Sequence, residues 1–133
     1  MARIEKFEDI EAWKLARRAT KLVYEVSLTE RLCRDFALVN QIRRASISIL
    51  SNIAEGFERE GNKEFLQFLS IAKGSYGEVR AQLYIAFDQN YIDEASFSSI
   101  SETLKETSRT ISGLMKYLKG AIFEEASLRP FEL

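Results

Sequence analysis

The apolar residues of this chain recur with the period of an α-helix in four separate segments, and this spacing constrains the fold more than any other feature. We expect helices over residues 9–26, 32–54, 62–90 and from about 94 to 122. No segment shows the strict alternation of apolar and polar residues that is typical of a strand. The connections are only about 4 to 8 residues long, which makes consecutive helices antiparallel. The sequence therefore predicts an all-α fold, an antiparallel up-down-up-down four-helix bundle.

One apolar stripe on each helix is expected to form the core. The stripes are Ala12, Leu15, Ala16, Ala19, Leu22, Val23 and Val26; Leu38, Ile42, Ala45, Ile49 and Ile53; Phe65, Phe68, Leu69, Ala72, Tyr76, Val79, Leu83, Ala86 and Phe87; and Phe97, Ile100, Leu104, Ile111, Met115, Leu118 and Ile122. On the second helix Phe36, Ile47, Leu50 and Phe57 widen the apolar arc to about 200°, so this helix is expected to contact neighbours on two sides. Trp13 falls outside the stripe of the first helix. Both features indicate a need for a partner surface.

Local signals set the expected ends of the helices. Gly56 and Gly61 bracket a polar segment that we interpret as the turn between the second and third helices. Asn62 is the expected N-cap of the third helix, and Asp93 that of the fourth. Gly120 is the expected C-terminal signal of the fourth helix.

The composition is that of one globular domain, with 133 residues, 46% hydrophobic, 29% charged and a single proline. We expect one bundle domain over residues 1–123 and an irregular tail over 124–133. The formal net charge is −1, so the chain has no overall positive field of the kind that drives non-specific nucleic-acid binding. Because no signal peptide or apolar run of about 18 residues is present, we expect a cytoplasmic protein with no membrane partner.

The residue types restrict the chemistry. The sequence has no histidine, which excludes a Ser-His-Asp triad, a Cys-His pair and the Glu-x-x-His elements of a di-iron bundle. The single cysteine, Cys33, is expected to be a buried or half-buried packing residue. Glu55 and Glu58 supply half of the carboxylate pattern of all-α magnesium-dependent pyrophosphohydrolases, but Glu78 is followed three residues later by Ala81, which leaves too few ligands. We therefore expect no catalytic residues, no metal and no cofactor.

Lys73-Gly74-Ser75 has a superficial likeness to a phosphate-binding loop. It lies inside an expected helix, without a preceding strand or the upstream glycine that such a loop requires. We interpret Gly74 instead as a small residue that allows a neighbouring helix to approach closely.

Two polar surfaces are candidates for binding. Lys14, Arg17, Arg18 and Lys21 form one basic patch on the first helix, of a size to meet a few phosphates of a nucleic acid. The alternative interpretation is a solvated outer face.

A polar stripe on the second helix contains Arg44, Ser48, Asn52 and Glu55. It is either solvated or a buried polar seam between subunits, in which case every group needs a partner. The antiparallel pairing of the second and third helices also places Arg44 near Glu78, and we hypothesise that a contact between them fixes the register of these helices.

The run from Gln41 to Phe57, QIRRASISILSNIAEGF, closely resembles the signature of four-helix-bundle proteins encoded in intervening sequences of bacterial 23S ribosomal RNA genes. The resemblance continues through Phe7, Trp13, Phe65, Phe68, Leu69, Ala72, Gly74, Ser75, Glu78, Gln82, Leu83, Tyr91, Ile92, Tyr117 and Leu118. It implies a four-helix bundle that assembles as a homopentamer and has no known catalytic activity. The same superfamily includes accessory variability proteins of diversity-generating retroelements, which bind a reverse transcriptase and its RNA.

These observations favour a non-enzymatic oligomeric bundle that acts as a scaffold or accessory factor. The alternative is a nucleic-acid or reverse-transcriptase-binding accessory protein of a mobile or retroelement-type system, which would use the basic patch of the first helix. A magnesium-dependent hydrolase is the third hypothesis, and the incomplete carboxylate pattern argues against it.

Overall fold

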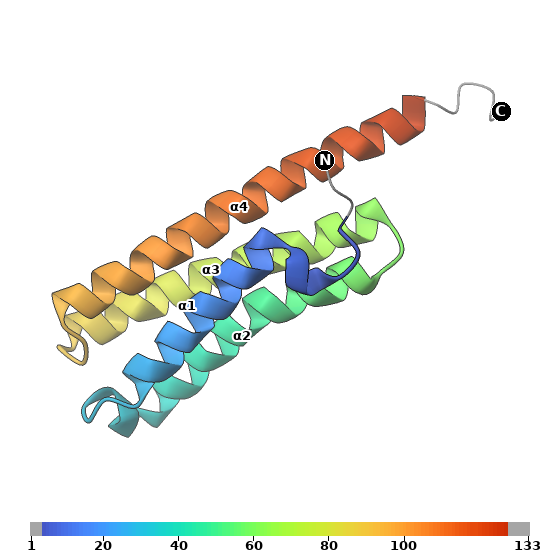
Figure 1. Ribbon diagram of the computed structural model, residues 1–133. Helices are drawn as coiled ribbons and strands as arrows, with labels where there is room; N and C mark the ends of the chain where they lie inside the picture. Colours follow the sequence, from blue (N-terminus) through green and yellow to red (C-terminus); the bar gives the residue numbers. More distant parts are fainter. Residues whose placement is uncertain (1–3, 128–133) are drawn as a thin grey trace.

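The computed structural model describes residues 4–127, which form four α-helices and two short 3-10 helices and contain no strand. The α-helices are α1 (Glu11–Ser27), α2 (Phe36–Glu58), α3 (Asn62–Asp88) and α4 (Glu94–Ser127), and the 3-10 helices are η1 (Phe7–Asp9) and η2 (Leu32–Arg34). Consecutive helices run in opposite directions (Figure 1), and α1 contacts α2 and α4 while α3 contacts α2 and α4. The predicted all-α four-helix bundle is confirmed.

The predicted stripes supply the core. On α2 the five predicted residues, Leu38, Ile42, Ala45, Ile49 and Ile53, are all buried. The other three helices behave in the same way, since every residue of their predicted stripes is buried or half-buried. Each large buried side chain of this kind contributes roughly 1.5–3 kcal/mol relative to an exposed one. The stripes therefore placed the core correctly, although Phe36 and Ile47, which widened the predicted apolar arc of α2, are exposed.

The α2 helix begins later than predicted, at Phe36 instead of Leu32. Leu32 is fully buried, but it belongs to the 3-10 turn η2, so its apolar character did not distinguish a turn from a helix. Asp35 caps α2, because its carboxylate Oδ1 accepts a hydrogen bond from the backbone N–H of Leu38 at 3.1 Å. Cys33 is half-buried in the same turn, as expected.

The α2 helix also ends later than predicted, and Gly56 lies inside it. Gly56 is buried against α3, where a Cβ atom on this residue would lie 2.6 Å from Phe68 Cβ and 3.0 Å from Phe65 Cδ1. The interpretation of Gly56 as a turn residue was wrong. Its lack of a side chain allows α2 and α3 to approach closely, and this pair forms the most extensive helix contact of the bundle.

The N-cap of α3 is Gly61, so the prediction of Asn62 was wrong by one residue. Asn62 is the first residue of the helix, and its side-chain amide donates a hydrogen bond to Glu125 Oε1 of α4 at 2.8 Å. The amide therefore joins two helices and does not cap one.

The connection between α3 and α4 follows the prediction closely. Asn90 has a left-handed backbone with φ 60°, and its N–H donates to the carbonyl of Phe87 at 3.0 Å. The N–H of Tyr91 donates to the carbonyl of Ala86 at 2.9 Å, which completes a Schellman motif. Asp93 caps α4 as predicted, since its Oδ1 accepts from the N–H of Ser96 at 2.7 Å.

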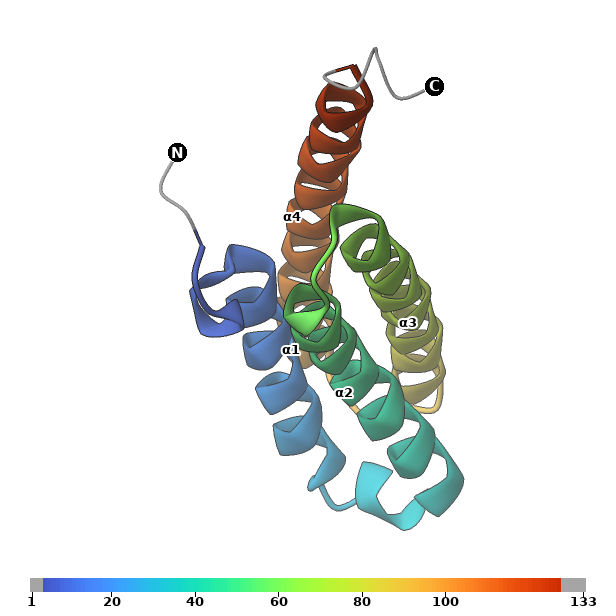
Figure 2. The same ribbon diagram turned by 90° about the vertical axis from the view of Figure 1, so that its right-hand side faces the viewer.

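The α4 helix runs through Gly120 to Ser127, so the predicted stop at Gly120 was wrong. No described glycine has a positive φ, and Gly120 keeps a helical backbone. The predicted irregular tail is wrong for residues 124–127, and its remaining residues, 128–133, lie outside the described part. As a result, α4 projects beyond the turn between α2 and α3 (Figures 1 and 2).

None of the helices in residues 4–127 combines the length and the apolar character that a membrane crossing requires.

Replacing Gly56 with alanine is expected to destabilise the fold by about 1–3 kcal/mol, because the new methyl group would overlap Phe68. The matched control Gly120→Ala adds the same group in open space and is expected to stabilise the chain by about 0.5–1 kcal/mol through helix propensity. Urea unfolding followed by circular dichroism at one protein concentration measures both. Equal stability of the two variants would contradict the packing role of Gly56.

Asp93 predicts a specific pH dependence. Hydrogen bonds from Ser96 lower its pKa below the ordinary value of 3.8, so its contribution to stability is fully present above that value and is lost as the pH falls through the lowered pKa. The melting temperature of Asp93→Ala should therefore lie below that of the wild type at neutral pH and approach it in acid. Asp93→Asn keeps an acceptor without a titrating group, so its difference from Asp93→Ala should stay constant. A wild-type advantage that does not narrow in acid would overturn this assignment.

Candidate interaction surfaces

The basic patch predicted on the first helix lies on the outer face of α1. Lys14, Arg17, Arg18 and Lys21 are all exposed. Lys14 lies 4.0 Å from the carboxylate of Glu11, and both side chains are more than half exposed, so this ion pair neutralises the patch only weakly. The structure brings the four cations together as the sequence predicted.

Trp13 lies beside this patch and is half-buried. The ring of Phe7 in η1 packs edge-on against it, with 5.1 Å between centroids, and the guanidinium of Arg17 lies 5.7 Å from the indole centroid. The indole Nε1 is buried and has no hydrogen-bond partner among the described residues. Contacts within the chain therefore account for much of the off-stripe position of Trp13.

The polar stripe of α2 divides into an internal part and an exposed part. Ser48 Oγ lies 2.7 Å from Ser75 Oγ on α3, and the Asn52 amide donates to the carbonyl and the Oγ of Ser48 at 2.8 and 3.0 Å. Both serines and Asn52 are buried or half-buried. Arg44 is exposed at one end of the stripe, and Glu55 forms an exposed ion pair with Arg59 at 3.3 Å at the other. The middle of the stripe is a polar contact between two helices of one chain.

The hypothesis that Arg44 contacts Glu78 within the chain was wrong. Both side chains are exposed, and no ion pair joins them among the described residues. The register of α2 and α3 rests instead on the hydrogen bond between Ser48 and Ser75 and on the packing of Gly56 against Phe68.

Gly74 faces outward from α3, and apart from the backbone of its own helix and its chain neighbours no atom of the described chain lies within 4 Å of a Cβ built on it. The expectation that it allows close packing is not met by a neighbour in the same chain. Ile71 and Ile85 are 51% and 48% exposed, and their spacing from Gly74 and Glu78 puts all four on one face of α3. Arg44 borders this face, because it lies one turn before Ser48, which touches α3. We call these five residues the outer α2–α3 face.

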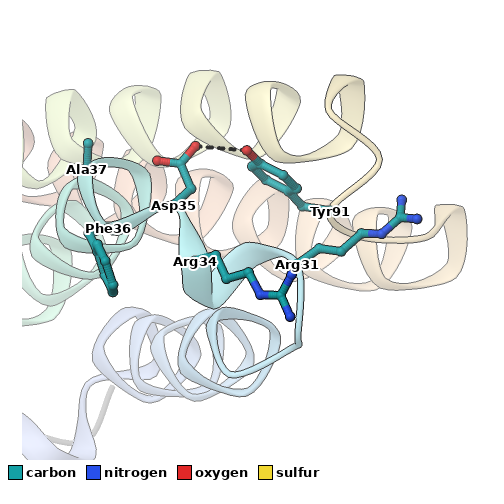
Figure 3. A pocket seen from close by; sticks show the side chains of 6 residues that line it. All are labelled: Arg31, Arg34, Asp35, Phe36, Ala37 and Tyr91. Atoms are coloured by element: carbon teal, nitrogen blue, oxygen red, sulfur yellow. Dashed lines mark hydrogen bonds between the residues drawn. The ribbon is translucent and has the colours of Figure 1, made fainter.

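Sequence reasoning missed a contact at the end of the bundle that holds the α1–α2 and α3–α4 loops. The Tyr91 hydroxyl donates to Asp35 Oδ2 at 3.1 Å (Figure 3), which joins the loop after α3 to the cap of α2. This hydrogen bond, with partial desolvation and the carboxylate charge, raises the pKa of Tyr91. No spacing rule pairs two residues so far apart in sequence, and only the folded topology brings them together.

An open concavity of about 590 Å³ lies beside this contact (Figure 3). Its lining is Arg31, Arg34, Asp35, Phe36, Ala37 and Tyr91. Arg34 is paired with Glu30 at 3.2 Å, and Asp35 is committed to capping α2 and accepting from Tyr91. The polar groups of this concavity therefore serve the loops. Across residues 4–127, no three metal-ligating side chains of the His, Cys, Asp or Glu type form a cluster.

Comparisons with known proteins agree with this architecture. The chain is similar to a protein of unknown function from the S23 ribosomal protein family of Bacteroides thetaiotaomicron VPI-5482, whose crystal structure was determined at 1.70 Å resolution. The two are 22% identical, with a TM-score of 0.72 over 79% of this chain and 95% of the other. At this identity the likeness concerns the fold. No curated protein matches the chain.

The sequence pattern of the 23S rRNA-intervening sequence protein family matches residues 8–113, which cover all of α1, α2 and α3 and more than half of α4. This match includes the run from Gln41 to Phe57 and the third-helix residues on which the resemblance rested. The chain therefore belongs to the 23S rRNA-intervening sequence protein family.

Proposed function

We propose that this chain is a non-enzymatic, homo-oligomeric bundle that acts as a scaffold or accessory factor, and that copies contact one another through the outer α2–α3 face. The observation that carries the proposal is the open space beside Gly74. Glycine inside a helix costs about 0.5–1 kcal/mol relative to alanine. The space at Gly120 is equally free, but Gly74 lies on the face that also exposes Ile71 and Ile85, so a close approach by a second chain there gives this glycine a purpose.

The neighbours of Gly74 support the same proposal. Ile71 and Ile85 expose about half of their surface, and a partner helix seated over Gly74 would remove both from water. Arg44 and Glu78 have opposite charges and no ion-pair partner among the described residues, so each can pair across an interface. An apolar centre with a charged rim is the usual anatomy of a contact between subunits. The expected stoichiometry of five copies comes from the family resemblance.

Gly74→Leu is the direct test, because a Cβ at this position meets no other helix of the described chain, so the larger side chain would extend outward and block the approach of a partner. We expect the wild type to have about five times the chain mass of 15.3 kDa in light scattering coupled to size exclusion, and the variant to have the monomer mass. Circular dichroism should show the helical content of both chains to be equal.

The matched control is Gly120→Leu, which makes the same change at an equally open position of α4. It should retain the wild-type mass. A monomeric wild type at micromolar concentration, or a Gly74→Leu variant with the wild-type mass, would remove the basis of the proposal.

A second candidate function is favoured by the α1 patch. Four exposed cations within two turns, of which only Lys14 has an ion-pair partner among the described residues, suit contact with the phosphates of RNA or DNA. The chain would then act as a nucleic-acid or reverse-transcriptase-binding accessory protein.

Charge reversal at Arg17 and Arg18 tests this second function. Fluorescence anisotropy with labelled single-stranded RNA should show salt-dependent binding that Arg17→Glu/Arg18→Glu weakens by about tenfold or more. The control Arg31→Glu/Arg34→Glu reverses two exposed arginines at the bundle end and should have a much smaller effect. A wild type that does not bind RNA at low salt would refute the idea.

A further inference from the structure

A second cationic surface lies on the seam between α3 and α4, away from the α1 patch. It surrounds a concavity of about 240 Å³ that is lined by Lys73, Ser112, Met115, Lys116 and Lys119. Three of these five side chains carry an ammonium group, and none carries a carboxylate. A concavity of this size accommodates a small anion with several charges.

Lys73 is held in place at this concavity. Its side chain crosses from α3 to α4, where Nζ donates to Ser112 Oγ at 2.7 Å, and both residues are half-buried. A lysine ammonium has three donors, so two remain for a ligand. Lys116 and Lys119 are exposed, and no ion pair joins any of the three lysines to a described residue. Glu124 lines a separate concavity on the other side of Lys116 and does not pair with it.

The same seam carries further cations towards the other end of the bundle. Lys105, Arg109, Ser112, Lys116 and Lys119 recur at intervals of four, three, four and three residues, which places them on one face of α4. Only Lys105 has a carboxylate partner among the described residues, Glu102 at 3.8 Å, and both are substantially exposed.

Arg80 extends the seam on α3. It lies two turns after Lys73, and Lys105 lies two turns before Ser112, so the antiparallel register brings these two cations to the same level. Arg80 is exposed beside Tyr76, with its guanidinium carbon 6.0 Å from the ring centroid. The seam thus carries two cationic clusters about 10 Å apart. The first is Lys73 with Lys116 and Lys119, and the second is Arg80 with Lys105.

We propose that the α3–α4 seam is a binding site for oligophosphates, with Lys73, Lys116 and Lys119 holding one phosphate group and the second cluster meeting a phosphate farther along the same chain. The chain as a whole has a net charge of −1, so this concentration of unpaired positive charge is a local feature. Repulsion among ammonium groups around one small concavity is relieved when an anion binds between them. The ligand is either a free oligophosphate or the phosphate backbone of a nucleic acid. The site does not depend on the assembly proposed above.

The test measures tripolyphosphate binding by titration calorimetry at low salt. The seam variant is Lys73→Gln/Lys116→Gln/Lys119→Gln, and the matched control Arg31→Gln/Arg34→Gln/Lys63→Gln removes the same charge from exposed positions outside both cationic surfaces. We expect the seam variant to lose about tenfold or more in affinity, while the control changes by less than about twofold. An equal loss in both variants would show an effect of overall charge and would overturn the proposal.

A second arm uses a single-stranded RNA oligonucleotide over a range of salt concentrations. The proposal is supported if the wild type binds RNA and the seam variant binds it more weakly and with a smaller salt dependence. If tripolyphosphate does not bind, this result identifies the phosphodiester backbone as the ligand. Absence of binding to both probes would overturn the proposal. Thermal melting checks that each variant folds. If the triple variant fails, Lys116→Gln/Lys119→Gln leaves the Lys73–Ser112 contact intact and should still lower the affinity.

Discussion

The close packing of α2 against α3 is the contact on which the rest of the molecule depends. Gly56 allows the two helices to approach, and the hydrogen bond between Ser48 and Ser75 sets their relative position along the axis. Because side chains on a helix repeat every three or four residues, this register determines which residues of α3 face inward and which face outward. This register exposes Gly74 on one side of α3 and the cations of the α3–α4 seam on the other.

The core was predictable because burial depends mainly on apolar periodicity. Leu38 to Ile53 on α2 and Ile100 to Leu118 on α4 repeat with the helical period, and these stripes are buried. Helix ends were less predictable, because glycine has several roles. The sequence predicted a helix end near Gly56 and near Gly120, but both glycines lie within helices. Gly56 lies at a tight contact with α3, and Gly120 faces open space. Only a neighbouring helix distinguishes these cases.

The candidate surfaces were predictable where they lie on one helix. Lys14, Arg17, Arg18 and Lys21 were found because consecutive turns of α1 carry them. The α3–α4 seam was not predicted, because Lys73 is remote in sequence from Lys116 and Lys119. Only the pairing of α3 with α4 brings the three lysines together. The Arg44–Glu78 hypothesis failed for a related reason, since adjacency along two paired helices does not fix the direction in which two long side chains point.

The lengths of the helices give the two ends of the bundle different physical properties. The α4 helix has 34 residues and α1 has 17, so the last turns of α4 extend past the helices that support its middle (Figure 2). At the other end, the hydrogen bond from Tyr91 to Asp35 connects the two loops. Helix stability in proteins comes chiefly from packing, and no residue between 119 and 127 is fully buried, so we expect these last turns of α4 to open at a lower free energy than its middle. The two ends of the bundle are therefore held differently, one by a hydrogen bond between two loops and the other by a single hydrogen bond from Asn62 to Glu125 that ties the last turns of α4 to α3.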